Sequence, residues 1–127
     1  MAERPIWRNS APLRASRPLP TQTQLIDLRV RQNRLLVGQL LAMIAENKAL
    51  VETLNQEIRA EELRTGIFDR DHFTYSTIAK AALTRRDNLL LSTNVLQIQL
   101  QEVETALAEA MAQATRQCAP LSNRDAA

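Results

Sequence analysis

Aromatic residues are scarce in this sequence. The chain of 127 residues has four of them, Trp7, Phe68, Phe73 and Tyr75, and none lies inside either of its long stretches of periodic apolar residues. Aromatic rings supply much of the buried area of thick globular cores. Here the apolar residues are mainly Leu, Ile, Val and Ala, which suit a seam between thin helices. The composition therefore argues against an ordinary globular core.

Proline is absent from the whole centre of the chain. Pro5, Pro12, Pro18 and Pro20 crowd the first twenty residues, and Pro120 lies near the end. Proline breaks helices, so its absence between these groups predicts long uninterrupted helices. We expect an all-α fold, a two-helix antiparallel coiled-coil hairpin, preceded by a disordered Pro/Arg-rich tail at residues 1–20.

Cysteine, histidine and glycine are too few for most kinds of active site. A lone Cys118 cannot form an internal disulfide and favours a reducing compartment, and no signal peptide or membrane-spanning run is evident, so we predict a cytoplasmic protein. Gly38 and Gly66 cannot build a phosphate-binding loop, and Cys118 has no histidine in sequence reach. We expect no enzyme, no catalytic residue, no cofactor and no small-molecule ligand.

The single histidine, His72, follows Asp69 and Asp71, so these three could in principle form a weak divalent-metal site. One His with two loop carboxylates falls short of the ligand set of a committed metal site. Roles in the loop and in capping are the stronger reading, and we predict no metal.

The excess of positive charge belongs to the tail. Residues 1–20 carry four arginines against Glu3, whereas acidic and basic residues balance within each periodic stretch. A basic protein raises the question of nucleic-acid binding, but the interleaved acids leave no basic stripe to follow a phosphate backbone. An RNA-binding helical arm is therefore a weak alternative.

Local signals set the helix boundaries. Thr21 followed by Gln24 fits a capping box, and Gly66 suits the left-handed residue that ends many helices. We predict a first helix at about residues 22–64, a tip at 65–75, a second helix at about 76–117 and a flexible C-terminus at 118–127.

A heptad repeat runs through both predicted helices. The first carries β-branched residues at every seventh position, and the second carries apolar residues at a matching interval: Val30, Val37, Ile44, Val51 and Ile58, then Ala82, Leu89, Leu96, Val103 and Ala110. Pairing the rows in antiparallel order gives residue numbers that always sum to 140, with the apex at Arg70. The same rule sets Asn47 opposite Thr93, so a polar residue faces a polar one. Basic residues near each helix end would also lie beside acidic ones of the other helix.

More apolar residues are present than one seam can cover. Two further rows have helical spacing, Leu36, Met43 and Leu50 on the first helix and Leu91, Val95 and Ile98 on the second. Phe73 and Tyr75 add aromatic side chains at the tip, where they either cap the end of the hairpin or take part in recognition. These eight residues are the candidate partner-binding set. Either a second copy covers the rows in a homo-oligomer or four-helix packing, or a different protein docks there.

The tip also carries a resemblance to a known family. The runs AEELRTGIFD at residues 60–69, HFTY at 72–75, AKAA at 79–82 and RRDNL at 85–89 resemble the alphaproteobacterial branch of the FliJ family of flagellar export proteins. The likeness covers roughly residues 40–110. It implies a coiled-coil hairpin of the bacterial cytoplasm, at most peripheral at the inner face of the cytoplasmic membrane.

The resemblance implies a non-enzymatic stalk or adaptor of the flagellar type III export apparatus. Its implied partners are the export ATPase ring, the export gate protein and export chaperones. The chain departs from that branch in its Pro/Arg-rich front, in a second helix expected to stop near residue 117, and in Arg70 and Ser76, which stand where the branch often has proline. These departures leave open which end meets the ATPase. The alternative function is a self-assembling structural bundle or a general coiled-coil adaptor.

Overall fold

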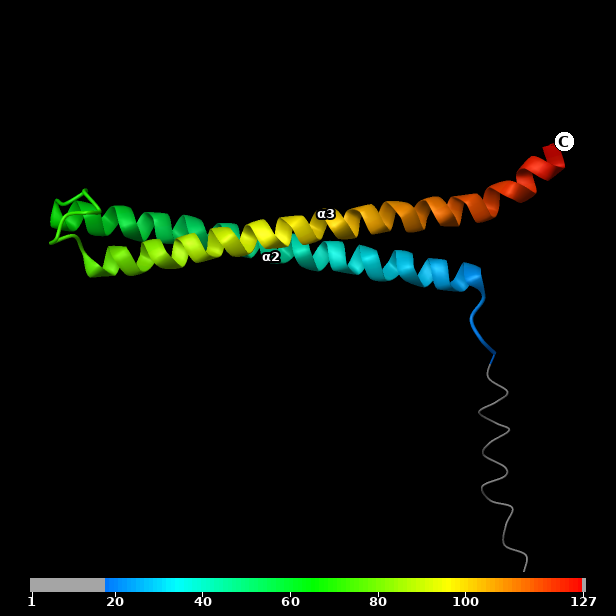
Figure 1. The fold of residues 1–127 in the computed structure, drawn as a ribbon, viewed down its shortest axis with the longest axis horizontal. Coiled ribbons are helices and arrows are strands. Elements are labelled where there is room, and N and C mark those ends of the chain that lie inside the picture. The colour runs from blue at the N-terminus through cyan, green and yellow to red at the C-terminus, as the bar shows by residue number, and fades with distance from the viewer. Residues whose placement is uncertain (1–17, 127) are drawn as a thin grey trace, which may run out of the picture.

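The computed structural model describes residues 18–126, with side chains described for residues 18–117. Two helices, α2 (Gln22–Thr65) and α3 (Thr77–Ala126), lie antiparallel along most of their length and form a thin rod (Figure 1). The predicted all-α hairpin is therefore confirmed. Pro18 to Pro20 precede α2 as exposed, non-helical chain, and the rest of the predicted disordered tail lies outside the described residues.

The two ends of α2 are closed by side-chain and backbone hydrogen bonds. The Gln24 amide donates to the Thr21 hydroxyl at 3.1 Å, and the Thr21 amide donates to Oε1 of Gln24 at 2.9 Å. This is the reciprocal capping box that the sequence predicts. At the other end Gly66 adopts a φ of 75°, and its amide donates to the Glu62 carbonyl at 2.8 Å. A residue with a β-carbon would be strained in that conformation.

The end of α3 differs from the sequence prediction. The helix continues to Ala126, past Pro120 and past the end expected near residue 117. A proline removes one helical hydrogen bond, but a helix can pass through it with a bend. The last turns have no facing helix, because α2 begins at Gln22, and Figure 1 shows them curving away from α2.

The heptad positions account for the buried surface. Most side chains of α2 and α3 that are not exposed lie either on the two predicted rows or at the second seam position of the same heptads, such as Leu40 and Leu54 on α2 and Leu100 on α3. The buried seam residues form two clusters, each completed by half-buried neighbours: Leu40, Ile44 and Leu96, then Leu54, Ile58 and Ala82. At the open end, the Thr23 hydroxyl donates to Oε1 of Gln117 at 2.8 Å, and these two residues also obey the predicted pairing rule. The register with its apex at Arg70 is therefore confirmed.

A polar layer separates the two apolar clusters. Thr93 is 6% exposed, and its hydroxyl donates to the Leu89 carbonyl at 2.8 Å, so it carries no unpaired polar atom into the seam. The predicted counterpart Asn47 is half-buried. A second polar contact crosses the seam where Nη1 of Arg86 donates to Oδ1 of Asn55 at 3.2 Å. Such layers cost little when satisfied, and they disfavour a shifted register.

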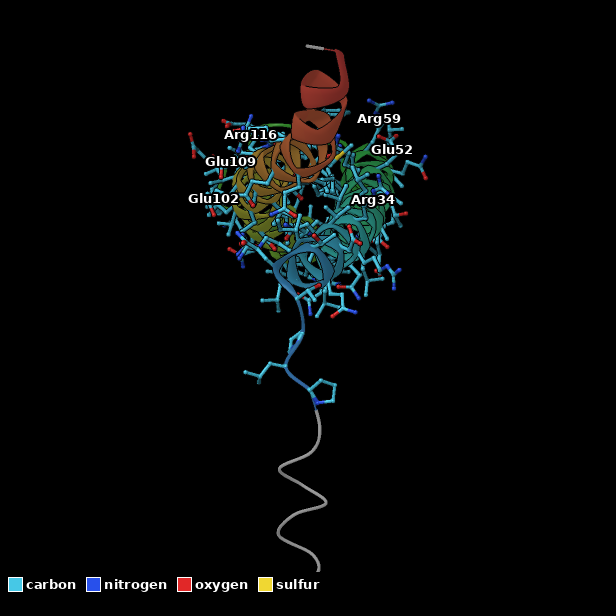
Figure 2. All side chains as sticks on the ribbon, turned by 90° about the vertical axis from the view of Figure 1, so that its right-hand side faces the viewer. Arg34, Glu52, Arg59, Glu102, Glu109 and Arg116 are labelled. Carbon is cyan, nitrogen blue, oxygen red and sulfur yellow. The ribbon has the colours of Figure 1, made fainter. Side chains whose placement is uncertain are left out.

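Ion pairs do not join α2 to α3 among the described side chains. Within the described side chains the ion pairs are Arg64 with Glu61 and Arg86 with Asp87, and both lie within one helix or its last turn. The labelled charged residues in Figure 2 lie on the outside of the rod. The sequence predicted that basic residues of one helix lie beside acidic residues of the other, but these residues form no ion pairs between α2 and α3 in the part of the chain whose side chains are described. Long, hydrated side chains gain little from such pairing, which explains this result.

We expect Ile58→Ala to lower the free energy of unfolding by about 2–4 kcal/mol, because Ile58 is 3% exposed in the seam and the neighbouring helix cannot fully close the gap. Leu63→Ala is the matched control on the same helix, since Leu63 is 66% exposed, and it should change the free energy by less than about 0.5 kcal/mol. Urea unfolding followed by circular dichroism measures both. Equal losses of unfolding free energy in the two variants would contradict the placement of Ile58 in a buried seam.

Candidate interaction surfaces

Both apolar rows predicted from the sequence lie exposed on the rod. On α2, Leu36, Met43 and Leu50 are 43–49% exposed, and on α3, Leu91, Val95 and Ile98 are 54–65% exposed. Seam residues beside them are nearly closed to solvent, so these rows are excess to the hairpin itself. The structure leaves both rows available on the surface.

The middle of the rod also lacks charge. Residues 35–45 of α2 and 88–101 of α3 contain no acidic or basic side chain, and the register sets these stretches partly side by side. Leu35, Leu41 and Leu90 add to the exposed apolar surface there, with 64%, 50% and 45% exposure. The sequence reasoning missed these three because it followed single rows, whereas the gap in charge would have found them. A long uncharged surface with repeated apolar side chains is typical of a protein-binding site.

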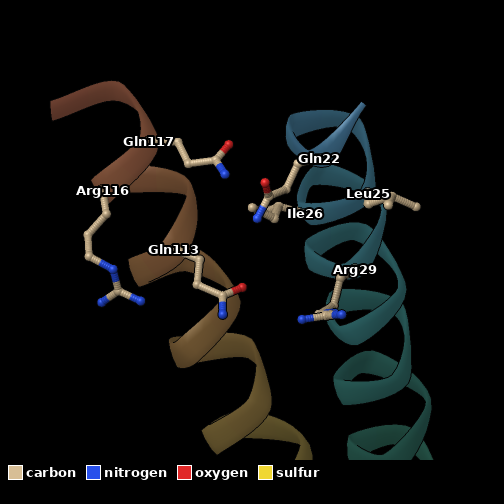
Figure 3. Close-up of a pocket in the computed structure, with 7 residues that line it drawn as sticks. All are labelled: Gln22, Leu25, Ile26, Arg29, Gln113, Arg116 and Gln117. Carbon is tan, nitrogen blue, oxygen red and sulfur yellow. The ribbon is translucent and has the colours of Figure 1, made fainter. Parts of the chain in front are cut away.

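Two shallow grooves lie on the same side of the hairpin. One is lined by Leu50, Glu57, Arg85 and neighbouring residues and has a volume of about 320 Å³. The other lies near the open end and has a volume of about 540 Å³ (Figure 3). Both are lined by equivalent heptad positions of α2 and α3, so they belong to one face.

The groove at the open end was not selected from the sequence. Figure 3 shows Gln22, Ile26, Gln113 and Gln117 between the two helices, with Arg29 lower on α2. Its residues come from ends of the chain about ninety positions apart, so only the register brings them together. The lining combines the apolar Leu25 and Ile26 with three glutamines and two arginines, and it contains no acidic residue. The groove is too open to enclose a small molecule.

The tip is a compact loop fastened to the last turn of α2. The Tyr75 hydroxyl donates to Oε2 of Glu62 at 3.1 Å, and the Ser76 hydroxyl donates to Oε1 of Glu61 at 2.7 Å. The same Ser76 oxygen accepts the Ala79 amide at 3.3 Å, in the manner of a helix N-cap. Two carboxylates of α2 therefore hold the entry of α3.

The two aromatic residues proposed at the tip have different surroundings. Phe73 is 90% exposed and stacks on the His72 ring with centroids 4.8 Å apart. Tyr75 is 3% exposed, so its assignment to a partner surface needs correction. Its ring closes the end of the hairpin, and burial together with the bond to Glu62 raises the pKa of its hydroxyl.

His72 and its acidic neighbours serve the loop. Nδ1 of His72 accepts the Thr74 amide at 3.1 Å, and Oδ1 of Asp69 accepts the Asp71 amide at 3.1 Å. Among the described residues, no three or more histidine, cysteine or carboxylate side chains gather as metal ligands would. In the same part of the chain, no helix has the apolar length needed to cross a membrane.

Comparisons of the chain with protein-family models, with curated proteins and with solved structures found no match.

The bonds at the tip predict a pH dependence of stability. Hydrogen bonds from Arg64 and then Ser76 lower the pKa of Glu61 from 4.5 to about 2, because both donors favour the ionised carboxylate. The stabilisation by Glu61 is thus present above pH 4.5 and is lost as the pH falls toward about 2. Glu61→Gln should melt at a lower temperature than the wild type at pH 7, with the difference shrinking below pH 4.5. Glu52→Gln is the exposed control, and its melting temperature should stay close to that of the wild type. A melting-temperature difference between Glu61→Gln and the wild type that does not change with pH would contradict this role.

Proposed function

We propose that the chain is a non-enzymatic stalk or adaptor of the bacterial flagellar type III export apparatus. The observation that carries the proposal is a stiff two-helix rod whose uncharged middle exposes two apolar rows. The resemblance of residues 60–89 to the FliJ family suggests flagellar export as the process. The resembling residues include those whose hydrogen bonds hold the tip against α2. Glu61, Glu62 and Tyr75 all belong to that region, and they make the bonds that hold the tip.

The proposed partners follow from the same resemblance. They are the export ATPase ring, the export gate protein and export chaperones, which places the chain in the bacterial cytoplasm, at most peripheral to the membrane. No catalytic step is assigned to this chain. Its role is to present contacts at fixed separations, since α2 alone extends over roughly 66 Å at ~1.5 Å per residue.

The physics of a coiled-coil rod suits a coupling role. Two helices packed along a continuous seam resist bending more than one helix does, so a displacement at one end is transmitted to the other. Partners that bind exposed apolar rows bury area without disturbing the seam, so the contacts can form and break during an ATPase cycle. We assign the outer row Leu91, Val95 and Ile98 to such a contact, with the exposed Phe73 as a second contact at the tip.

Substitution of the outer row tests the proposal. The double variant Leu91→Glu with Val95→Glu should lose at least about 90% of the binding to the cognate export ATPase or gate protein in a pull-down, because two charges enter an apolar contact. Gln32→Glu with Gln39→Glu is the matched control, since it adds the same charge to exposed positions of α2, the helix that does not carry this row.

Circular dichroism of each variant establishes whether the hairpin is intact. Absence of binding by the folded wild-type chain to both partners would overturn the proposed function. Equal loss in the two double variants would instead overturn the assignment of Leu91 and Val95.

A self-assembling structural bundle is the second candidate, and the two unpartnered rows favour it. In that case the chain forms dimers or tetramers by light scattering and captures neither export protein.

A further inference from the structure

One face of the hairpin has a symmetric pattern along α2. Leu36, Met43 and Leu50 lie on it, and Ser92, Gln99 and Ala106 of α3 lie beside them; we name these six residues the Met43 face. The two grooves contain residues at multiples of seven from this set, so the face continues through both grooves. It is therefore one surface, running along the rod beside the seam.

The charges on the Met43 face are arranged around its centre. Continuing the row on α2 in steps of seven leads to Arg29 on one side and to Glu57 on the other, each fourteen residues from Met43. Both are exposed, both line a groove, and neither forms an ion pair among the described side chains. The α2 row is thus basic at one end, acidic at the other and apolar between.

We infer that the Met43 face binds a second copy of this chain, with the two rods antiparallel and related by a two-fold axis at Met43. The axis sets Met43 against the partner's Met43 and Leu36 against the partner's Leu50. It sets Arg29 against the partner's Glu57 at both ends of the interface. By the pairing rule Met43 is level with residue 97 of α3, so the same axis sets Gln99 close to the partner's Gln99 and Ser92 close to the partner's Ala106.

A parallel arrangement does not match the side chains as well. A two-fold axis along the rod sets α2 against α3 of the other copy, so that Leu36, Met43 and Leu50 face Ala106, Gln99 and Ser92. Each large apolar side chain then meets a small or polar one. The antiparallel arrangement pairs apolar with apolar residues and opposite charges with each other.

The opposite side of the hairpin does not support the same association. Its row on α2 contains Arg34, Leu41 and Lys48, so a two-fold axis at Leu41 sets Arg34 against the partner's Lys48. Like charges facing each other disfavour the contact. Charge complementarity therefore selects the Met43 face among the two sides of the seam.

Analytical ultracentrifugation of the full chain over a wide concentration range tests the inference. The wild type should form dimers, and Met43→Lys should weaken dimerisation at least about tenfold, because two like charges meet at the axis. Arg29→Glu and Glu57→Arg should each weaken it, whereas the double variant should restore it, since opposite charges again face each other. Arg31→Glu and Glu52→Arg, on exposed positions of another face, are the charge-matched controls.

Cross-linking tests the register. In a Cys118→Ser background, Met43→Cys should be joined to its symmetry mate by a short thiol cross-linker, because the two thiols meet on the axis. Leu91→Cys, at an exposed position on another row, should remain largely uncross-linked under the same conditions.

A monomer at every concentration overturns the inference, as does a dimer that survives Met43→Lys or equal cross-linking at both positions. Failure of the double charge reversal to restore the dimer overturns the antiparallel register. The inference does not rest on the proposed function, because Leu91 and Ile98 lie on a different row of α3. A variant that loses the dimer but still binds the export proteins, or one that keeps the dimer but no longer binds them, distinguishes the inferred dimer from the proposed function.

Discussion

The burial of one narrow apolar seam is the constraint on which the rest of this structure depends. A hairpin of two helices has no third layer, so a shift by one or two residues would set the seam of each helix against polar positions of the other. The clusters around Ile44 and Ile58 hold the register on either side of the polar layer at Thr93. Every outer surface takes its position from that register.

The tip joins the two helices and fixes where α3 begins relative to α2. Gly66 ends α2, while Glu61 and Glu62 bind the hydroxyls of Ser76 and Tyr75 across the loop. These bonds set where α3 begins, and through it which residues of α3 face α2. The region that resembles the FliJ family is thus also the region that fastens the two helices, so the resemblance and the fold concern the same residues.

Surfaces that the seam leaves uncovered determine how the rod meets other molecules. The proposed contact row on α3 and the Met43 face follow different heptad positions, so the proposed partner and the inferred second copy would meet the rod at different places. The absence of charge in the middle of both helices allows these contacts, because burying them does not require stripping water from ions. In the inferred dimer, Arg29 and Glu57 would determine the orientation of the two copies more than the strength of binding.

By itself the sequence determined the two helices, the register and the exposed rows, because periodicity, capping residues and missing prolines act locally or through a regular repeat. It predicted Thr21, Gly66 and the pairing of Ile44 with Leu96 correctly. Only the tertiary structure decided that Tyr75 is buried while Phe73 is exposed, and that α3 continues past Pro120. These depend on the path of an irregular loop and on contacts between distant residues, which no repeat encodes.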